Sequence, residues 1–544
     1  MPDQDPPCPG PAPEHYDLLV IGGGVNGAGI ARDAAGRGYA VCLCEQGDFA
    51  GGTSSASTKL FHGGLRYLEY LEFRLVREAL IEREVLLRAM PHISWPLRFV
   101  LPYHAAMRFD TATPVSRLLS VLMPWQRGRR PAWLVRLGLA LYDRLGRREI
   151  LPPTRNLDLT ADAAGRPLKP EFRRAFEYSD CWVDDARLVI LNLRDAQARG
   201  ARIDARSTVL RAVYDQQHWQ VDIRDADGQT RRVTAAVIVN SAGPWVDQVL
   251  HNVFGQNDVH NIRLVRGSHI VVARKFDHDR AYFFQNADGR IIFAIPYESD
   301  YTLIGTTDMD HPDLATKPEI TAEERDYLCR MASIYFREPV RPEDIVWTYS
   351  GLRPLFDDGA SGATEATRDY VVRPDPALGN GRLLNIFGGK LTTYRRLAEA
   401  VLDQVEDILG RRGPAWTATA HLPGGDLPVD QVDGLIGKVA ADYPWLDDFT
   451  ARRLVRSYGT EVPLVLGPPG SAPAEGETFG AGLTAAEVHH LITREWARSA
   501  QDIAFRRTKL GLRLNEDQIA RLDAYVAQVL ADPQQRPAQT AREH

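Results

Sequence analysis

One short stretch, SSASTKLFHGGLRYLEY (54–70), gathers side chains that could do chemistry. It begins with small hydroxyl residues, contains a glycine pair, and carries His62, Arg66 and Tyr67 around that pair. Small residues and glycines let a backbone pass close to a bound group. The composition therefore suits a loop beside a cofactor, with three polar side chains close by.

A dinucleotide motif lies upstream of this stretch. An apolar run at 16–21 is typical of a buried parallel strand, and a helix is expected at about 25–37. Between them, three glycines fit the pattern GxGxxG: Gly22, Gly24 and Gly27. They allow a tight turn, a close approach of pyrophosphate, and close helix packing. The helix N-terminus would face the phosphates.

The ligand is expected to be FAD rather than NAD or NADP. Glu45 ends a second strand at 39–44, where it would bind a ribose hydroxyl and disfavour a 2′-phosphate. The strand VTAAVIVNSAGPW (233–245) breaks into small residues. The stretch at 383–409 is a strand, a glycine pair and a long helix, whose N-terminus would stabilise negative charge on a reduced flavin.

Composition excludes several other classes. The 544 residues suggest more than one domain, and 44% hydrophobic with 25% charged residues is typical of a soluble globular protein. A net charge of -6 gives no reason to expect nucleic acid. Five scattered cysteines without a CxxC pair predict no metal site, no disulfide framework and a reducing compartment. Neither a secretory signal nor a membrane-spanning helix is expected.

Seven motifs in order resemble the FAD-dependent glycerol-3-phosphate dehydrogenases, within the D-amino-acid-oxidase-like group, from about 16 to about 530. They are GGGVNGAGIARDAAGRG, TSSASTKLFHGGLRYLEYLEFRLVREALIEREVLL, FEYSDCWVDDARLV, GSHIVV, IGTTD, IVWTYSGLRPL and FGGKLTTYR. The resemblance implies an α/β fold: a Rossmann-like FAD-binding domain with an inserted α+β substrate sheet, then a C-terminal helical domain. It also implies oxidation of sn-glycerol 3-phosphate to dihydroxyacetone phosphate, with electrons passed to membrane quinone.

The expected cofactor contacts follow from the motifs and this resemblance. They are Gly22, Gly24, Asn26, Gly27, Glu45, Thr53, Ser54, Ser55, Lys59, His62, Gly63, Ala242, Gly243, Gly388, Gly389, Leu391 and Thr392.

The substrate needs positive charge for its phosphate and a group that handles the carbon-2 hydroxyl proton. We expect Arg66 and Tyr67 to bind phosphate, with Lys390 beside the phosphate or the flavin edge. The alternative for Arg66 is a surface position on the amphipathic helix that follows. Arg353, in SGLRP, resembles the family arginine near the reacting carbon.

The candidate base is His269, at the start of an apolar strand; the alternative is an ordinary core histidine. His62 is a further catalytic candidate, and the division of labour between His269 and Arg353 is a hypothesis. The stretch Thr306 to Asp308 closes a predicted hairpin and is interpreted first as structural.

The segment 98–149 predicts a contact with anionic lipid. Its charge is mostly arginine, and the apolar pieces VSRLLSVLMPW and PAWLVRLGLALYDRL interleave with that charge. Arginine and aromatic residues beside amphipathic helices fit an interfacial anchor. The alternative is a solvated basic face over a buried helix. With the resemblance, this places the protein on the inner face of the cell membrane.

We expect five parts of the chain. They are a disordered leader (1–14), an FAD-binding unit with interleaved substrate sheet (15–410), a linker (411–430), a helical domain (431–530) and a mobile tail (531–544). Helical patterns are strongest at 485–504 and 516–530. The sequence does not decide the assembly, and a homodimer is one candidate.

Three alternatives remain open. The first is a glycerol-3-phosphate oxidase that reduces oxygen, which has no need of a membrane face. The second is an amine or amino-acid oxidase of the same fold, against which Arg66, Tyr67 and Lys390 count. The third is a redox-silent flavoprotein scaffold, which the complete set of candidate site residues disfavours.

Overall fold

The computed structural model describes residues 14–104, 114, 131–146, 148–257, 259–286, 288–357, 369–472 and 476–532. Of Arg66 only the backbone is described. The predicted leader and tail therefore lie almost wholly outside the described residues, as does nearly all of 105–130.

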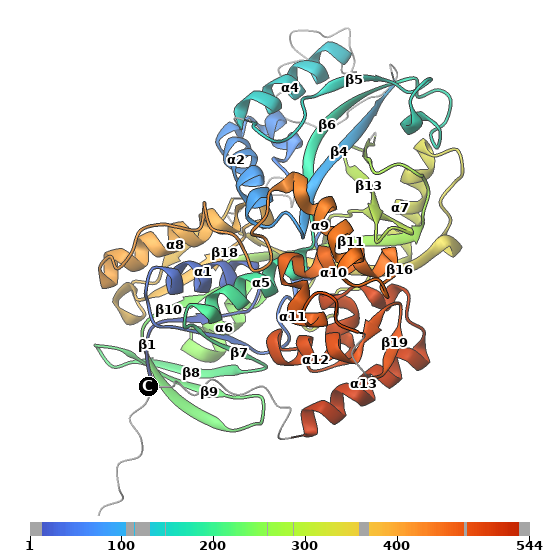
Figure 1. The fold of residues 1–544 in the computed structure, drawn as a ribbon. Coiled ribbons are helices and arrows are strands. Elements are labelled where there is room, and N and C mark those ends of the chain that lie inside the picture. Colours follow the sequence, from blue (N-terminus) through green and yellow to red (C-terminus); the bar gives the residue numbers. More distant parts are fainter. Residues whose placement is uncertain are drawn as a thin grey trace, which may run out of the picture.

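The dinucleotide motif lies in an eight-stranded sheet in which five neighbouring strands run parallel (Figure 1). Its path is β17 (Val371–Pro374), β18 (Leu383–Phe387), β10 (Thr230–Asn240), β1 (Glu14–Ile21), β2 (Val41–Glu45) and β7 (Arg202–Ala205), with β9 (Trp219–Arg224) on β10 and β8 (Thr208–Tyr214) on β9. The order has β1 at its centre, so the glycine turn after β1 opens at the carboxyl edge of the sheet, where dinucleotides bind.

Three helices cover one face of this sheet: α1 (Val25–Gly36), α5 (Asp185–Ala198) and α8 (Tyr394–Leu409). Their apolar sides share a core with β1, β2 and β10, whereas α6 (Val246–Phe254) packs with the hairpin β8–β9 on another core. Helix α1 can pack this closely because a Cβ at Gly27 would lie 2.0 Å from the Gly22 carbonyl oxygen.

The second sheet has ten strands, and it is antiparallel except where β12 meets β4. Its path is β15 (Met309–Asp310), β11 (Ile262–Ala273), β14 (Tyr301–Gly305), β13 (Ile291–Tyr297), β12 (Ala281–Gln285), β4 (Ser94–Tyr103), β6 (Arg174–Val183) and β3 (Leu60–Phe61), with β16 (Ile345–Phe356) on β11 and β5 (Arg155–Asp158) on β6. The predicted hairpin is confirmed as β13 and β14. Thr306 to Asp308 follows the second strand of this hairpin directly.

Helices cover both faces of this sheet. Helix α7 (Ala322–Tyr335) packs on one face, and α2 (Phe73–Ala89) with α4 (Ala132–Leu145) packs on the other. A capping box begins α7, in which the Thr321 hydroxyl accepts from the N–H of Glu324 and the Glu324 carboxylate accepts from the N–H of Thr321. Arg353 lies within β16, which continues through the following proline to Phe356.

The C-terminal part is mainly helical. Its elements are α9 (Val432–Asp442), α10 (Asp448–Tyr458), α11 (Val462–Leu466), β19 (Thr478–Gly480), β20 (Leu483–Thr484), α12 (Ala485–Arg494) and α13 (Glu516–Ala531). The helical pattern at 485–504 is broken in the structure: α12 ends at Arg494, and Trp496 has a φ of 58°, which an α-helix does not allow. A π-helical turn, η11 (Asp502–Arg507), follows.

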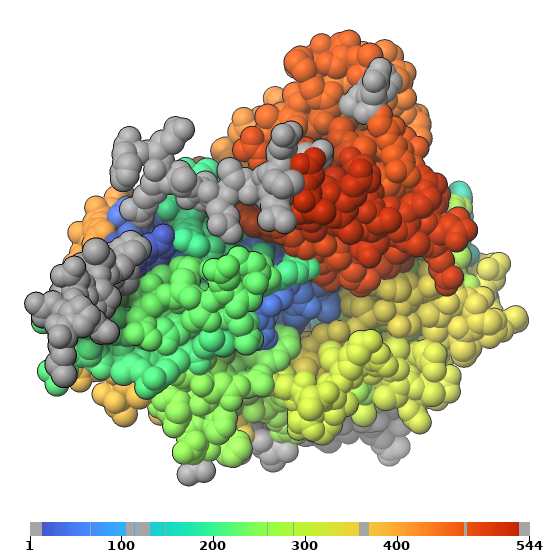
Figure 2. Space-filling view, turned by 90° about the horizontal axis from the view of Figure 1, so that it is seen from below, coloured from blue at the N-terminus to red at the C-terminus, as the bar shows by residue number. Residues whose placement is uncertain are grey.

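The C-terminal helices pack on both sheets, and Figure 2 shows them in red against the green and yellow parts of the chain. Buried charges fix this contact. Arg187 of α5 forms an ion pair with Glu495, and both side chains are at most 1% exposed. Lys509 binds Asp184 at 2.9 Å. Buried pairs hold orientation strongly, because breaking one leaves an uncompensated charge.

His92 lies fully buried near this contact and predicts acid sensitivity. Burial, together with Arg187, Arg456 and Arg194, lowers the pKa of His92 to about 3. The unfolded chain therefore binds one more proton than the folded chain between that value and the ordinary histidine pKa of about 6.5. The free energy of unfolding should fall by about 1.4 kcal/mol per pH unit from this group as the pH drops through that window.

Chemical denaturation of the wild type and of His92→Gln between pH 7 and pH 5 tests this. The variant cannot titrate there, so its unfolding free energy should depend less steeply on pH, by about one proton. Equal slopes in the two proteins would show that His92 is protonated normally in the folded state.

Candidate functional site

A cavity of about 940 Å³ runs between the two sheets. At one end it is lined by the glycine turn before α1, and at the other by β11, β16 and the segment after β3. Ligand sites usually fall between roughly 300 and 1,000 Å³, so this cavity is at the large end of that range. Blue N-terminal residues are visible between the green, yellow and red parts in Figure 2.

The dinucleotide end is built from the predicted motif. Gly22 has a φ of 110°, a conformation that favours glycine. The Glu45 carboxylate accepts hydrogen bonds from the N–H groups of Gly23 and Gly47, each at 2.7 Å. The Ser54 hydroxyl accepts from the N–H of Val25 at 3.0 Å. The loop at 53–59 is thereby attached to the first turn of α1.

The glycine pair before α8 lines the middle of the cavity. Gly388 and Gly389 have φ values of 68° and 93°, and a Cβ at Gly389 would lie 3.2 Å from the Asn26 amide nitrogen. The short turn η8 (Leu391–Thr393) then leads into α8, so the positive end of a 16-residue helix lies at the cavity. This is suitable for a group that becomes negatively charged on reduction.

Arg353 reaches the other end of the cavity in a fixed orientation. Its guanidinium forms an ion pair with Asp308, and it donates to the Thr306 hydroxyl at 3.1 Å. A Cβ at Gly267 would lie 2.4 Å from the guanidinium, so only glycine at that position leaves room for this geometry. Arg353, Asp308 and Thr306 all line the cavity.

His269 lies beside Arg353 and is 1% exposed. Its Nε2 lies 3.0 Å from the Thr58 hydroxyl oxygen, and its ring stacks on Tyr349 with centroids 4.7 Å apart. Its Nδ1 has no hydrogen-bond partner among the described residues. Burial, then the charges of Arg353 and Lys59, lower the pKa of His269 well below its usual range. The imidazole is therefore neutral near pH 7 and can accept a proton.

Lys390 and Tyr67 form the cationic side of the cavity. The Lys390 ammonium lies 4.0 Å from the centre of the Tyr67 ring. Tyr67 belongs to η2 (Leu65–Tyr70), which begins after Gly64 at a φ of 72°. The backbone N–H of His62 donates to the Thr392 hydroxyl at 3.2 Å, so the segment after β3 is attached to the start of α8.

Lys59 is held away from solvent by an ion pair. Its ammonium lies 2.7 Å from Asp185 and donates to the Ser55 carbonyl at 3.0 Å, and the side chain is 1% exposed. Burial lowers the pKa of Lys59, although Asp185 opposes that shift. Lys59 lines the cavity, yet its charge is engaged in fixing the 53–59 loop to α5.

Most of the predicted site residues line this one cavity. Those that do are Gly22, Gly24, Asn26, Glu45, Thr53, Ser54, Lys59, His62, Tyr67, Ala242, Gly243, His269, Arg353, Gly388, Gly389, Lys390, Leu391 and Thr392. Gly27, Ser55 and Gly63 are not among the lining residues. Gly27 instead allows the close packing of α1, and the N–H of Gly63 donates to the Tyr142 hydroxyl at 2.8 Å.

Thr58, Asp308 and Arg506 line the cavity but were not assigned to the site from the sequence. Asp308 stands in the motif IGTTD, which was interpreted as structural, and its contact with Arg353 is the reason to assign it to the site. Thr58 lies within the stretch predicted to line a ligand. Arg506 gave no individual signal, because its place in the cavity depends on tertiary packing.

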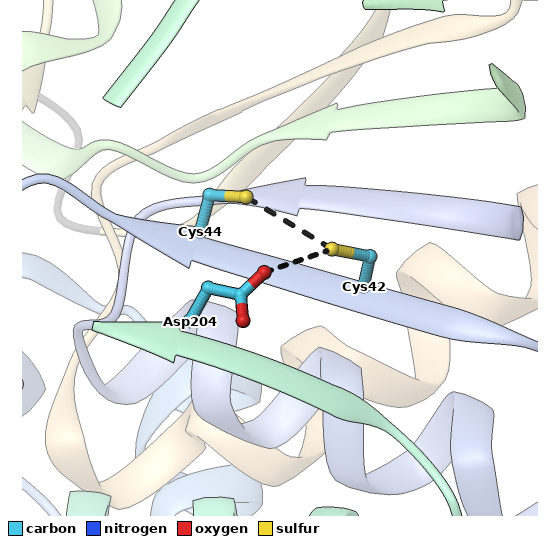
Figure 3. Close-up of side chains that lie close together, drawn as sticks. All are labelled: Cys42, Cys44 and Asp204. Atoms are coloured by element: carbon cyan, nitrogen blue, oxygen red, sulfur yellow. Dashed lines mark hydrogen bonds between the residues drawn. The ribbon is translucent and has the colours of Figure 1, made fainter. Parts of the chain in front are cut away.

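Among the described residues, one group of three side chains could bring metal-ligand atoms together: Cys42, Cys44 and Asp204 (Figure 3). The two sulfur atoms are 3.9 Å apart, and Cys42 lies 3.8 Å from the carboxylate. Asp204, however, already binds Arg202 at 2.9 Å and Arg231 at 2.5 Å. The hydrogen bond with Cys42 and burial raise the pKa of the Cys44 thiol. A thiol that stays protonated is a poor metal ligand, and the Asp204 carboxylate is already bound to two arginines, so this group does not favour a cation.

Four features define a flavin-dependent oxidoreductase. They are the parallel sheet, the glycine turn after β1, the Glu45 carboxylate placed for a ribose, and the N-terminus of α8 at the middle of the cavity. Residues 17–393 match the model of the FAD dependent oxidoreductase family, and residues 415–540 match that of the C-terminal domain of alpha-glycerophosphate oxidase. The chain belongs to the FAD-dependent oxidoreductase family that includes the glycerol-3-phosphate dehydrogenases. The predicted family and cofactor are thus confirmed.

Two relatives match almost the whole chain. D-erythritol 1-phosphate dehydrogenase of Brucella abortus is 48% identical over 93% of this chain and 96% of its own. Glycerol-3-phosphate dehydrogenase of Pseudomonas aeruginosa is 46% identical over 95% of this chain and 96% of its own. The solved glycerol-3-phosphate dehydrogenase of Bacillus halodurans, complexed with FAD, is 26% identical, with a TM-score of 0.67 and 97% coverage of each chain.

Proposed function

We propose that this protein oxidises sn-glycerol 3-phosphate to dihydroxyacetone phosphate. The observation that carries the proposal is the convergence of a neutral buried imidazole, His269, and a fixed guanidinium, Arg353, at the end of the cofactor cavity. Bound FAD supplies the acceptor for the hydride that leaves carbon 2. The relatives that act on glycerol 3-phosphate support the choice of substrate.

His269 takes the proton of the carbon-2 hydroxyl in this proposal. The Thr58 hydroxyl lines the cavity and already bonds Nε2, so the substrate hydroxyl donates to Thr58 while Thr58 donates to Nε2. Arg353 stabilises the negative charge that develops on the carbon-2 oxygen. The hydride leaves carbon 2 as the proton leaves the oxygen, so the product is a ketone.

The phosphate lies toward Lys390 and Tyr67. A phosphate dianion needs positive charge and fixed donors, and the Lys390 ammonium over the Tyr67 ring supplies both charge and direction. Asp308 forms an ion pair with Arg353, so this pair offers little net positive charge to a phosphate. The charges therefore set one orientation, with the hydroxyl groups toward Arg353 and Asp308. From the sequence motif we also expect Arg66 to bind the phosphate.

A longer polyol phosphate is the second candidate substrate, favoured by the 48% identity with a D-erythritol 1-phosphate dehydrogenase. Steady-state kinetics with purified holoenzyme and both phosphates, with a soluble quinone as acceptor, separates the two. We expect the larger kcat/KM with sn-glycerol 3-phosphate. A larger value with erythritol 1-phosphate would assign the longer substrate, and turnover at full speed with oxygen alone would assign an oxidase.

Helix α4 carries an apolar surface that we propose docks on the inner face of the cell membrane. Trp133, Leu137 and Leu141 recur every fourth residue and are 58%, 59% and 38% exposed. Leu71, just before α2, and Phe73, the first residue of α2, are also exposed, and α2 packs beside α4 (Figure 1). No helix within the described residues is long and apolar enough to cross a bilayer. An interfacial helix with nearby arginines fits anionic lipid.

This apolar surface belongs to a helix that contacts the substrate end of the cavity, which supports membrane quinone as the electron acceptor. Tyr142, on the buried side of α4, accepts from the N–H of Gly63 at 2.8 Å and donates to Asp180 at 2.8 Å. Gly63 precedes the segment that carries Tyr67. Helix α4 thus exposes apolar side chains on its outer side, and on its buried side Tyr142 fixes the segment that would bind the substrate.

Replacing both Trp133 and Leu137 with serine should weaken binding to anionic liposomes by about tenfold or more, because the apolar area that enters the interface is lost. Co-sedimentation with phosphatidylglycerol vesicles measures this. Leu464→Ser is the matched control, since Leu464 is 64% exposed but lies in the C-terminal domain. Equal binding by all three proteins would remove α4 as the lipid contact.

A further inference from the structure

Among the described residues of the C-terminal domain, one side chain reaches into the cofactor cavity. Arg506, in the π-helical turn η11, lines the cavity together with Glu45 and Asp48. The FAD family model ends at residue 393, so this arginine comes from outside the part of the chain that the model covers.

Two neighbouring arginines bind one carboxylate on the cofactor loop. Arg506 donates from Nε to Asp48 at 2.5 Å, and Arg507 donates to both oxygens of Asp48 at 2.9 and 2.8 Å. Arg507 is 0% exposed and also binds the Glu495 carbonyl. Asp48 follows Glu45 by three residues, so these contacts hold the loop that presents the ribose carboxylate.

The same loop touches the glycine turn directly. The N–H of Ala50 donates to the Gly23 carbonyl at 3.1 Å, and a Cβ at Gly23 would meet the Phe49 ring at 2.4 Å. Phe49 is fully buried and packs edge to face on Trp496 of the C-terminal domain, with ring centroids 5.2 Å apart. The loop at 45–50 is therefore held between the glycine turn and the C-terminal domain.

The position identifies which part of FAD is involved. The pyrophosphate belongs at the N-terminus of α1 and the adenosine ribose at Glu45, so the cavity next to Glu45 and Asp48 takes the adenosine. Arg506 is balanced there by Asp48 and by Asp502, each at 2.5 Å. Because these two carboxylates neutralise its charge, Arg506 has no net charge to offer a phosphate. Its planar face remains able to stack on adenine.

We propose that the C-terminal domain closes the adenosine end of the FAD site: Arg506 contacts the adenosine, and Arg506 with Arg507 fixes the cofactor loop through Asp48. FAD affinity then depends on side chains more than 450 positions away from the glycine motif in the sequence. This proposal concerns retention of the cofactor and is independent of which phosphate ester is oxidised.

The test compares FAD binding by the full-length wild type, Arg506→Gln and Arg194→Gln. Arg194 is the matched control, because it binds Glu461 of the C-terminal domain at 2.7 Å without lining the cavity. Each protein is stripped of flavin, its Tm is measured without and with FAD, and the Kd for FAD is measured by flavin fluorescence. No substrate is present, so a wrong substrate assignment leaves the result intact.

We expect Arg506→Gln to weaken FAD binding by about tenfold, which is typical of losing one stacked or charge-assisted contact. Arg194→Gln should bind FAD as the wild type does, even if the Tm of its flavin-free form falls. Arg506→Lys keeps a charge for Asp48 but not the plane, and should fall in between. An Arg506→Gln Kd within twofold of the wild type overturns the proposal, as does an equal loss in both glutamine variants.

Discussion

Replacing Arg353 with glutamine should slow anaerobic reduction of the bound flavin by sn-glycerol 3-phosphate by roughly 100- to 1,000-fold, the usual effect of losing one fixed donor to a developing oxyanion. The FAD content should not change, because Arg353 lies at the substrate end of the cavity. Stopped-flow absorbance at saturating substrate measures the rate. Glutamine keeps a planar donor group but removes the charge.

Asp308→Asn is the companion variant. It keeps the size of the side chain and one acceptor oxygen, but it weakens the ion pair that orients Arg353. We expect about a tenfold slower reduction, in line with the loss of one charge-assisted hydrogen bond. A normal reduction rate in Arg353→Gln would remove Arg353 from the chemistry, whatever the result for Asp308→Asn.

His269→Gln should lower the same reduction rate by roughly a thousandfold, within the range expected for loss of a general base. The low pKa of His269 gives a further signature. Because the imidazole is neutral in the folded protein well below pH 6.5, the wild-type rate should show no acid limb near that pH. The rate should fall only at more acidic pH, where His269 becomes protonated.

Variants of Thr58 distinguish between two roles for His269, a general base and a side chain that only packs. Thr58→Val removes the hydroxyl that bonds Nε2 and should slow reduction on the order of a hundredfold, whereas Thr58→Ser keeps the hydroxyl and should stay within a few-fold of the wild type. Equal rates in Thr58→Val and Thr58→Ser would exclude the proposed proton route. An unchanged rate in His269→Gln would remove His269 as the base.

The cofactor end of the site was predictable because its signals are local. A strand, three glycines, a helix and an acid follow one another within 30 residues, and each has a steric reason that the structure shows, such as the 2.0 Å approach at Gly27. The glycine pair before α8 was visible for the same reason. Positive φ values at Gly388 and Gly389 restrict which residues can stand there.

The substrate end was less predictable because its contacts join distant parts of the chain. Thr58 and His269 are 211 positions apart, and the packing of the 53–59 loop on β16 brings them within 3.0 Å. Asp308 looked structural, since its role depends on Arg353 lying across the sheet. The break at Trp496 was equally hidden, because the helical pattern continues past it while tertiary packing places Arg506 and Arg507 on Asp48.

The most direct test of the whole account is an anaerobic titration of the purified holoenzyme with sn-glycerol 3-phosphate, following the flavin absorbance band near roughly 450 nm. The account predicts rapid bleaching that goes to completion, and reoxidation by a soluble quinone that is faster than reoxidation by air. A flavin band that stays unchanged under saturating sn-glycerol 3-phosphate would contradict the proposed function.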